Sequence, residues 1–79
     1  MHVKITESQG AVLAVLEPGG MLTIDQIARA AQLTTYRTRS AVSALKSRGL
    51  ICSGSARMGR YQITDSGHRA YAAHGRVAR

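Results

Sequence analysis

The fold of this chain is decided by the stretch from Leu33 to Thr64, LTTYRTRSAVSALKSRGLICSGSARMGRYQIT. Thr34 occupies a helix N-cap position, where a threonine side chain accepts a hydrogen bond from the first helical turn. Gly49 follows at the position where a glycine in the left-handed conformation commonly ends a helix. Residues 50–52 and 61–63 then read as short strands, the second with alternating apolar side chains, joined by a glycine-flanked loop. The stretch therefore predicts a helix followed by a β-hairpin.

The charge of the same region is one-sided. No acidic residue lies between Asp25 and Asp65, whereas the basic residues in this interval are Arg29, Arg37, Arg39, Lys46, Arg48, Arg57 and Arg60. The net charge of the chain is +7, and arginine supplies most of its positive charge. Because the arginine fork suits phosphate and guanine, this bias indicates a nucleic acid whose groove admits the helix. A solvated basic surface, an acidic protein partner and a membrane surface are the alternatives.

Signals outside this stretch complete the predicted order of elements. Two threonine-x-x-glutamine motifs, which begin at Thr6 and Thr23, are capping boxes that open two helices. Pro18 and the two glycines after it stop the first helix, and residues 21–22 can form a very short strand. Thr64 caps a last helix after the hairpin. The predicted order is helix, short strand, helix, helix, hairpin, helix.

This order predicts an α+β fold that is mostly α, a winged helix-turn-helix. It has a three-helix core, a two- or three-stranded β-wing and a C-terminal helix. With 79 residues, we expect one domain over residues 1–79, with a disordered tail at 75–79. In the last helix, Ala70, Tyr71 and Ala73 are expected to turn toward the core.

The helix after Thr34 is expected to have one buried and one exposed face, at about 100° per residue. Its inner face consists of Thr38, Ala41, Val42 and Leu45. Its outer face consists of Tyr36, Arg39, Ser40, Ser43 and Ser47. Arg37 and Arg48 flank the outer face on one edge, and Lys46 flanks it on the other. Small polar groups with basic margins fit a groove about 12 Å wide, although an ordinary solvated helix face has the same composition.

The first helix carries more apolar surface than one small core obviously requires, namely Val12, Leu13, Val15 and Leu16. Leu13 falls near the edge of the expected buried stripe. We therefore predict a weak homodimer through this helix, with a contribution from the last helix near Tyr71. The alternative is a monomer in which Leu13 is packed inside.

The residues that could carry chemistry are few and scattered. His2, His68 and His74 lack metal-ligand spacing, and four separate acids form no acid–base pair. We expect neither a metal nor a cofactor, no small-molecule ligand and no catalysis. Cys52 is expected to be a small buried hydrophobe, and a lone cysteine favours a reducing compartment. The longest apolar run is too short to cross a membrane, so a cytoplasmic protein without a membrane partner is expected.

Two separated motifs resemble MarR-like bacterial regulators. The segment from Leu33 to Ile51, a leucine and a capping threonine followed by AVSALKSRGLI, is similar to their recognition helix. YQITDSG at 61–67 is similar to the join between the wing and the last helix. In full-length MarR regulators, long N- and C-terminal helices build the dimer. Here both flanking helices are short, so the chain looks more like a minimal phage or bacterial form.

The resemblance implies where DNA is bound. The N-terminal half of the recognition helix reads base edges, which carries that role to Thr35, Tyr36, Arg39, Ser40 and Ser43. For Tyr36 the alternatives are packing on a sugar, donating to a phosphate and covering the core. Arg37 and Lys46 on the margins of the helix join this DNA-binding set. On the wing, Arg57 and Arg60 fit a phosphate or minor-groove contact. We expect Arg39 to face guanine and Arg57 to face the backbone.

The function that these observations predict is sequence-specific binding of double-stranded DNA by a transcriptional regulator, with repression by occupying an operator. One rival is a winged-helix interaction module, a docking or inhibitory protein of a phage or mobile element that binds an acidic partner. Another is an accessory protein of DNA packaging or recombination, which would bind with less sequence preference.

Overall fold

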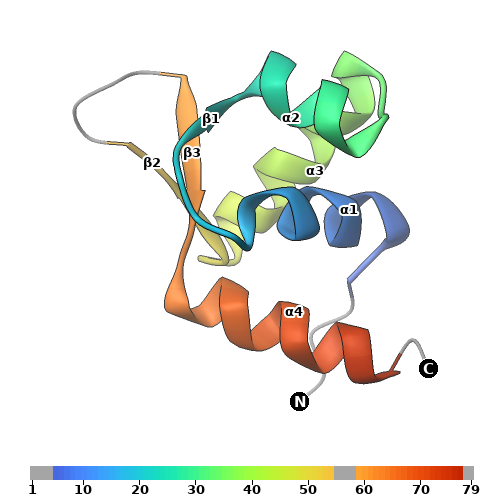
Figure 1. Ribbon diagram of the computed structural model, residues 1–79, viewed down its shortest axis with the longest axis vertical. Coiled ribbons are helices and arrows are strands. Elements are labelled where there is room, and N and C mark those ends of the chain that lie inside the picture. The colour runs from blue at the N-terminus through green and yellow to red at the C-terminus, as the bar shows by residue number, and fades with distance from the viewer. Residues whose placement is uncertain (1–4, 55–58, 78–79) are drawn as a thin grey trace.

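The computed structural model describes residues 5–54 and 59–77. Its elements are α1 (Glu7–Leu16), β1 (Leu22–Thr23), α2 (Ile24–Ala31), α3 (Thr35–Ser47), β2 (Ile51–Ser53), β3 (Arg60–Ile63) and α4 (Asp65–Val77). Figure 1 shows the small sheet along one side of the first three helices and α4 crossing beneath α1. The order of elements and the winged-helix fold predicted from the sequence are confirmed.

The three strands form one antiparallel sheet in the order β1-β3-β2. Leu22 of β1 pairs with Tyr61 of β3, and Ile51 of β2 pairs with Ile63. The first strand lies one residue later than the sequence predicted, since Leu22–Thr23 and not residues 21–22 form it. Because β1 precedes α2, its pairing with β3 attaches the hairpin to the start of the helical pair α2–α3.

The helix starts follow the predicted capping chemistry. Both capping boxes form: the Gln9 N–H donates to Thr6 Oγ1 at 3.2 Å, and the Gln26 N–H donates to Thr23 Oγ1 at 3.2 Å. Thr34 caps α3 through a bond from the Arg37 N–H at 3.1 Å. These bonds satisfy backbone donors that the first turn of a helix leaves without a partner.

The end of α3 is a Schellman turn centred on Gly49, whose φ is +75°. The Gly49 N–H donates to the Lys46 carbonyl, and the Leu50 N–H donates to the Leu45 carbonyl, both at 3.0 Å. Leu45 and Leu50 are both buried, so the turn also closes an apolar contact of the core. The predicted glycine stop is therefore confirmed.

The end of α2 uses the same left-handed turn without a glycine. Gln32 has φ +58°, and among the described residues it is the only non-glycine residue with a positive φ. The Leu33 N–H donates to the Ala28 carbonyl at 3.0 Å, which closes the turn. An L-residue in this region costs roughly 1–2 kcal/mol, so the turn between α2 and α3 is strained.

The core lies between α1, α2, α3 and the sheet and consists of Val12, Leu13, Leu16, Ile27, Ala41, Val42, Leu45, Leu50 and Ile51. The predicted inner face of α3 is confirmed, including fully buried Thr38, whose hydroxyl donates to the Thr34 carbonyl at 2.9 Å. The prediction that α1 offers Leu13 to a homodimer surface is wrong, because Leu13 is 0% exposed. Because α2, α3 and α4 all pack on α1, its buried stripe is wider than a one-sided helix wheel suggests.

Three smaller expectations also differ from the structure. In α4, Ala70 and Tyr71 pack against the core, but Ala73 is exposed. Cys52 is half-buried and accepts a weak hydrogen bond from Gln62 Nε2 at 3.6 Å, so it is not a core residue. The helix α4 continues to Val77, three residues into the segment expected to be a disordered tail.

One junction ties the end of α3 to the start of α4. Thr64 Oγ1 donates to the Gly49 carbonyl at 2.7 Å and accepts from the Gly67 N–H at 3.0 Å, while the Thr64 N–H donates to the Leu50 carbonyl at 3.0 Å. Gly67 is buried, and a Cβ there would collide with the Leu50 carbonyl oxygen and the Ile63 side chain. Only glycine fits at this crossing.

We predict that Gly67→Ala lowers the free energy of unfolding by about 3 kcal/mol, because the backbone of Leu50 cannot move away from the new methyl group. The matched control is Gly10→Ala. There the new Cβ would lie 2.8 Å from His74 Nε2, which is the far end of a side chain. Denaturant unfolding should show a change of less than about 1 kcal/mol for Gly10→Ala, since alanine also favours the helix. Equal losses in both variants would contradict this account.

We also predict that Gln32→Gly raises the free energy of unfolding by about 0.5–1 kcal/mol, because glycine relieves the left-handed strain at the end of α2. Ala30→Gly, at an exposed position inside the same helix, should lower it by about 1 kcal/mol. Thermal and denaturant unfolding of the two variants measure both changes. A loss of stability in Gln32→Gly would show that its side chain holds the turn.

Candidate nucleic-acid interface

The helix α3 presents one long exposed face beside the sheet. Its inner face is fixed in the core by Ala41, Val42 and Leu45, so its rotation about its own axis is set. The side chains on the crest of the opposite face are Tyr36, Ser40, Ser43 and Ser47, which we call the ridge. All four are exposed, and Tyr36 is the most prominent at 80%. The sequence prediction of an outward polar face is confirmed.

Basic residues lie on both edges of the ridge. Arg39 and Lys46 form the sheet-side margin, and Arg37 and Arg48 form the α1-side margin. All four residues are exposed. Thr35 is also exposed, in the first turn of α3. The sequence analysis placed Arg48 on this edge but left it out of the predicted DNA-binding set. Arg48 follows Arg37 by eleven residues, which is about three helical turns, and this spacing places both on the same edge.

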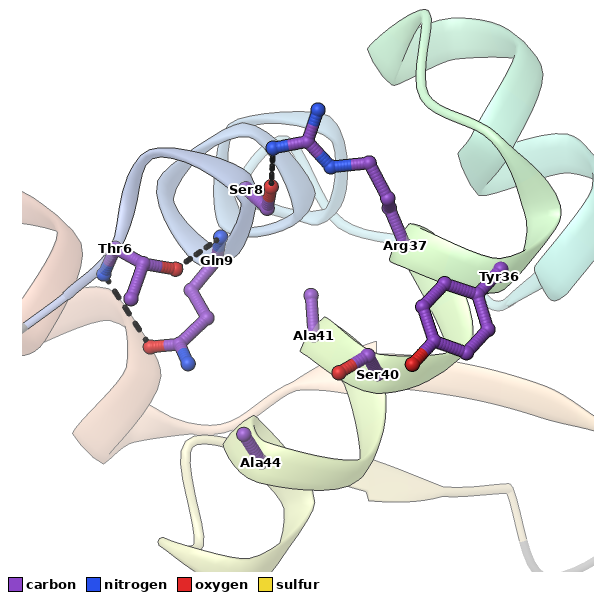
Figure 2. Close-up of a pocket in the computed structure, with 8 residues that line it drawn as sticks. All are labelled: Thr6, Ser8, Gln9, Tyr36, Arg37, Ser40, Ala41 and Ala44. Atoms are coloured by element: carbon purple, nitrogen blue, oxygen red, sulfur yellow. Dashed lines mark hydrogen bonds between the residues drawn. The ribbon is translucent and has the colours of Figure 1, made fainter.

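A hollow of about 300 Å³ separates α3 from the start of α1 (Figure 2). Its walls include Thr6, Ser8 and Gln9 on α1 and its cap, and Tyr36, Arg37, Ser40, Ala41 and Ala44 on α3. Arg37 reaches across to Ser8, where its Nη2 donates to the hydroxyl at 3.2 Å, and the Tyr36 ring lies along α3 with its hydroxyl beside Ser40 (Figure 2). Arg48 Nη1 donates to Gln9 Oε1 at 3.4 Å. Both residues of this margin are thus attached to α1.

A second hollow, of about 240 Å³, lies between α3 and the sheet. It is lined by Ile24, Arg39, Val42, Ser43, Lys46 and Tyr61. The floor is apolar, because Val42 is buried and Ile24 and Tyr61 are half-buried against the core. The stems of Arg39 and Lys46 can cover such a floor while their charged ends stay in water.

The wing residues are placed differently from each other. Arg60 is half-buried on β3, and its Nη1 lies 3.5 Å from the Met21 carbonyl, so its guanidinium is directed back toward the start of β1. The sequence assigned Arg60 to the edge of the hairpin loop. Arg57, the other predicted wing contact, lies outside the described residues.

The acidic residues lie on elements other than α3. Glu7, Asp25 and Asp65 occupy the first turns of α1, α2 and α4, where a carboxylate complements the positive end of the helix. Glu17 caps the end of α1 and lies 3.8 Å from His68 Nδ1 on α4. The first turn of α3 has no acid and carries Arg37 instead. Neither hollow is lined by a carboxylate, so the charged side chains that line them are all basic.

Two further features bear on the chemistry of the chain. Within residues 5–54 and 59–77, no three His, Cys, Asp or Glu side chains gather into a group that could hold a metal ion. In the same part of the chain, no helix combines the length and the apolar character that crossing a membrane requires.

Comparison with known proteins gives matches at the level of structure. No protein-family model matches the chain, and no curated protein matches it. Among solved structures, BpsR of Bordetella bronchiseptica, whose DNA binding is regulated by 6-hydroxynicotinic acid, matches 95% of the chain with a TM-score of 0.85 and 23% identity. MepR, a transcription regulator of the Staphylococcus aureus multidrug efflux pump MepA, matches 94% with a TM-score of 0.77 and 27% identity.

A MarR-family transcriptional regulator from Silicibacter pomeroyi matches 87% of the chain with a TM-score of 0.78 and 21% identity. The chain spans about half the length of these structures, namely 56% of BpsR, 58% of MepR and 49% of the Silicibacter protein. The sequence motifs and the matching solved structures point to the same fold, and the chain has a MarR-like winged-helix fold.

Proposed function

We propose that this chain binds double-stranded DNA in a sequence-specific way and regulates transcription. The observation that carries the proposal is the exposed, acid-free face of α3, with a basic margin on each side, next to a small antiparallel sheet. In this fold α3 enters the major groove, and the β2–β3 hairpin meets the backbone or the adjacent minor groove. The proposed contacts on α3 are Thr35, Tyr36, Arg37, Arg39, Ser40, Ser43 and Lys46, and those on the wing are Arg57 and Arg60.

Regulation would follow from occupying an operator, which makes repression the simplest outcome, with no chemistry on the DNA and no cofactor. A cytoplasmic location fits a protein that acts on bacterial or phage DNA. The rival function, a docking module for an acidic protein, would use the same basic face. The similarity to solved transcription regulators favours DNA over that rival.

We predict that duplex binding weakens steeply with salt. If α3 and the wing neutralise about four to six phosphates, the slope of log affinity against log salt should be about −4 to −5 per protomer. Fluorescence anisotropy with a labelled duplex at several salt concentrations measures this slope. Arg69→Gln is the matched control, because Arg69 lies on α4, donates to Ser66 at 3.4 Å and is remote from the ridge. A salt-independent affinity, or no duplex binding at low salt, would rule out DNA as the partner.

We also propose that two copies of the chain act together on the DNA. One recognition helix covers only a half-site, and useful specificity in a genome commonly needs two half-sites about one helical turn apart. Because Leu13 is buried, the apolar patch through which the sequence suggested pairing does not exist, and the homodimer must use another surface.

The stoichiometry of the complex tests this second proposal. Sedimentation of the protein with a duplex enriched from a random-sequence pool should show two protomers per duplex and an inverted repeat in the enriched sequence. The same duplex cut to one half of the repeat should bind one protomer more weakly. One protomer on the complete enriched duplex would rule out the homodimer.

A further inference from the structure

We propose that α3 divides its work on DNA: the ridge reads base edges, while the two margins hold phosphates on opposite strands. This inference rests on the proposed function and deepens it. It also changes two assignments made from the sequence: Arg39 becomes a phosphate contact, and Tyr36 becomes the principal residue that determines specificity.

The spacing of the basic residues sets the two margins. Arg39 and Lys46 are separated by about two helical turns, and Arg37 and Arg48 by about three, so each pair lies along one edge of α3. The two pairs lie on opposite edges of α3, since Arg39 and Lys46 line the hollow beside the sheet and Arg37 lines the hollow beside α1. Charge is thus absent from the crest of the helix and present on both of its sides.

The dimensions of DNA give this pattern a meaning. An α-helix with its side chains is about 10–12 Å across, and the major groove is about 12 Å wide. When such a helix fills the groove, its crest meets the base edges and its two sides meet the two phosphate backbones. A neutral crest with positive sides therefore matches the bases and the two backbones respectively.

The contacts of the α1-side margin limit its reach. The Arg37 guanidinium donates to Ser8, and that of Arg48 donates to Gln9, both on α1. An arginine bonded in this way is directed toward α1 and away from the crest. A guanidinium has five N–H donors, so Arg37 can keep its bond to Ser8 and still bind a phosphate oxygen.

The sheet-side margin is limited by its apolar floor. Arg39 and Lys46 both rise from the hollow above Ile24 and Val42, on the side of α3 that faces the wing. Laying their stems on this floor buries apolar surface, whereas turning them onto the crest would expose it. Their charged ends then project between α3 and the sheet, where a backbone passing from the major groove to the wing would run.

The ridge contains little that can read a base strongly. Serine hydroxyls can donate to or accept from several bases, so Ser40, Ser43 and Ser47 discriminate weakly. Tyr36 supplies the only ring on the ridge and is 80% exposed, at the N-terminal end of α3 that usually meets base edges. Most of the discrimination between sequences should therefore come from Tyr36.

The test compares a duplex enriched by the wild-type chain from a random-sequence pool with a scrambled duplex of equal composition. Arg39→Gln, Lys46→Gln and Arg37→Gln should each weaken binding to both duplexes by the same factor, within about twofold, and make the salt slope shallower by about 1 per protomer. Tyr36→Ala should weaken binding to the enriched duplex about tenfold while leaving the scrambled duplex within about threefold. Tyr36→Phe then separates the ring from the hydroxyl.

Single methylphosphonate substitutions in the enriched duplex assign the strands. Within one half-site, phosphates whose neutralisation weakens binding by the wild-type chain but not by Arg39→Gln should lie on one strand. Those found in the same way with Arg37→Gln should lie on the other strand of that half-site. Circular dichroism and the thermal midpoint check that each variant is folded, which is expected because all the substituted side chains are exposed.

The outcomes separate this inference from the proposed function. If Arg39→Gln loses discrimination at an unchanged salt slope, Arg39 reads a base and the division of work is wrong, although DNA binding stands. Assignment of Arg37 and Arg39 to the same strand within one half-site would overturn the arrangement of the margins. If the wild-type chain binds duplexes but enriches no sequence, the ridge does not read bases. If it binds no duplex at low salt, the proposed function fails and this inference fails with it.

Discussion

The structure depends on one crossing of the chain, where the end of α3, the start of β2 and the start of α4 meet. Gly49 reverses the chain, Thr64 bonds to its carbonyl at 2.7 Å, and Gly67 lies against the Leu50 backbone without room for a side chain. This crossing fixes α3 against the sheet and places α4 under α1 at once. Because Leu50 is also a core residue, a change at the crossing disturbs the packing as well as the hydrogen bonds.

The rotation of α3 is what links this crossing to the function. A helix whose inner face is buried and whose C-terminal end is held by hydrogen bonds presents the ridge and the two margins in a defined orientation. A nucleic-acid surface gains from such preorganisation, because little conformational freedom is lost on binding. The attachment of Arg37 to Ser8 extends the same principle to a side chain, since it holds one charge at the edge of the helix before any partner arrives.

The distribution of charge favours DNA binding at a cost to the stability of α3. The helices α1, α2 and α4 each begin with an acid in the first turn, which the helix dipole favours by about 0.3–1 kcal/mol. The first turn of α3 has no acid and carries Arg37, so it forgoes that stabilisation. An acid there would stand beside the groove that we propose for DNA. The strained left-handed Gln32, just before α3, is a second local cost on the same side of the molecule.

Local chemistry was sufficient to predict the helix starts, the glycine stop at Gly49, the order of the elements and the inner face of α3, because capping and periodicity act within a few residues. Packing among distant segments decided the rest. Leu13 is buried because three helices converge on α1, and Arg60 turns back to Met21 because β1 pairs with β3. The sequence placed Arg37 on one edge of a helix. Only the tertiary structure brought Ser8 to it, since a helix wheel describes one helix and not the neighbours that surround it.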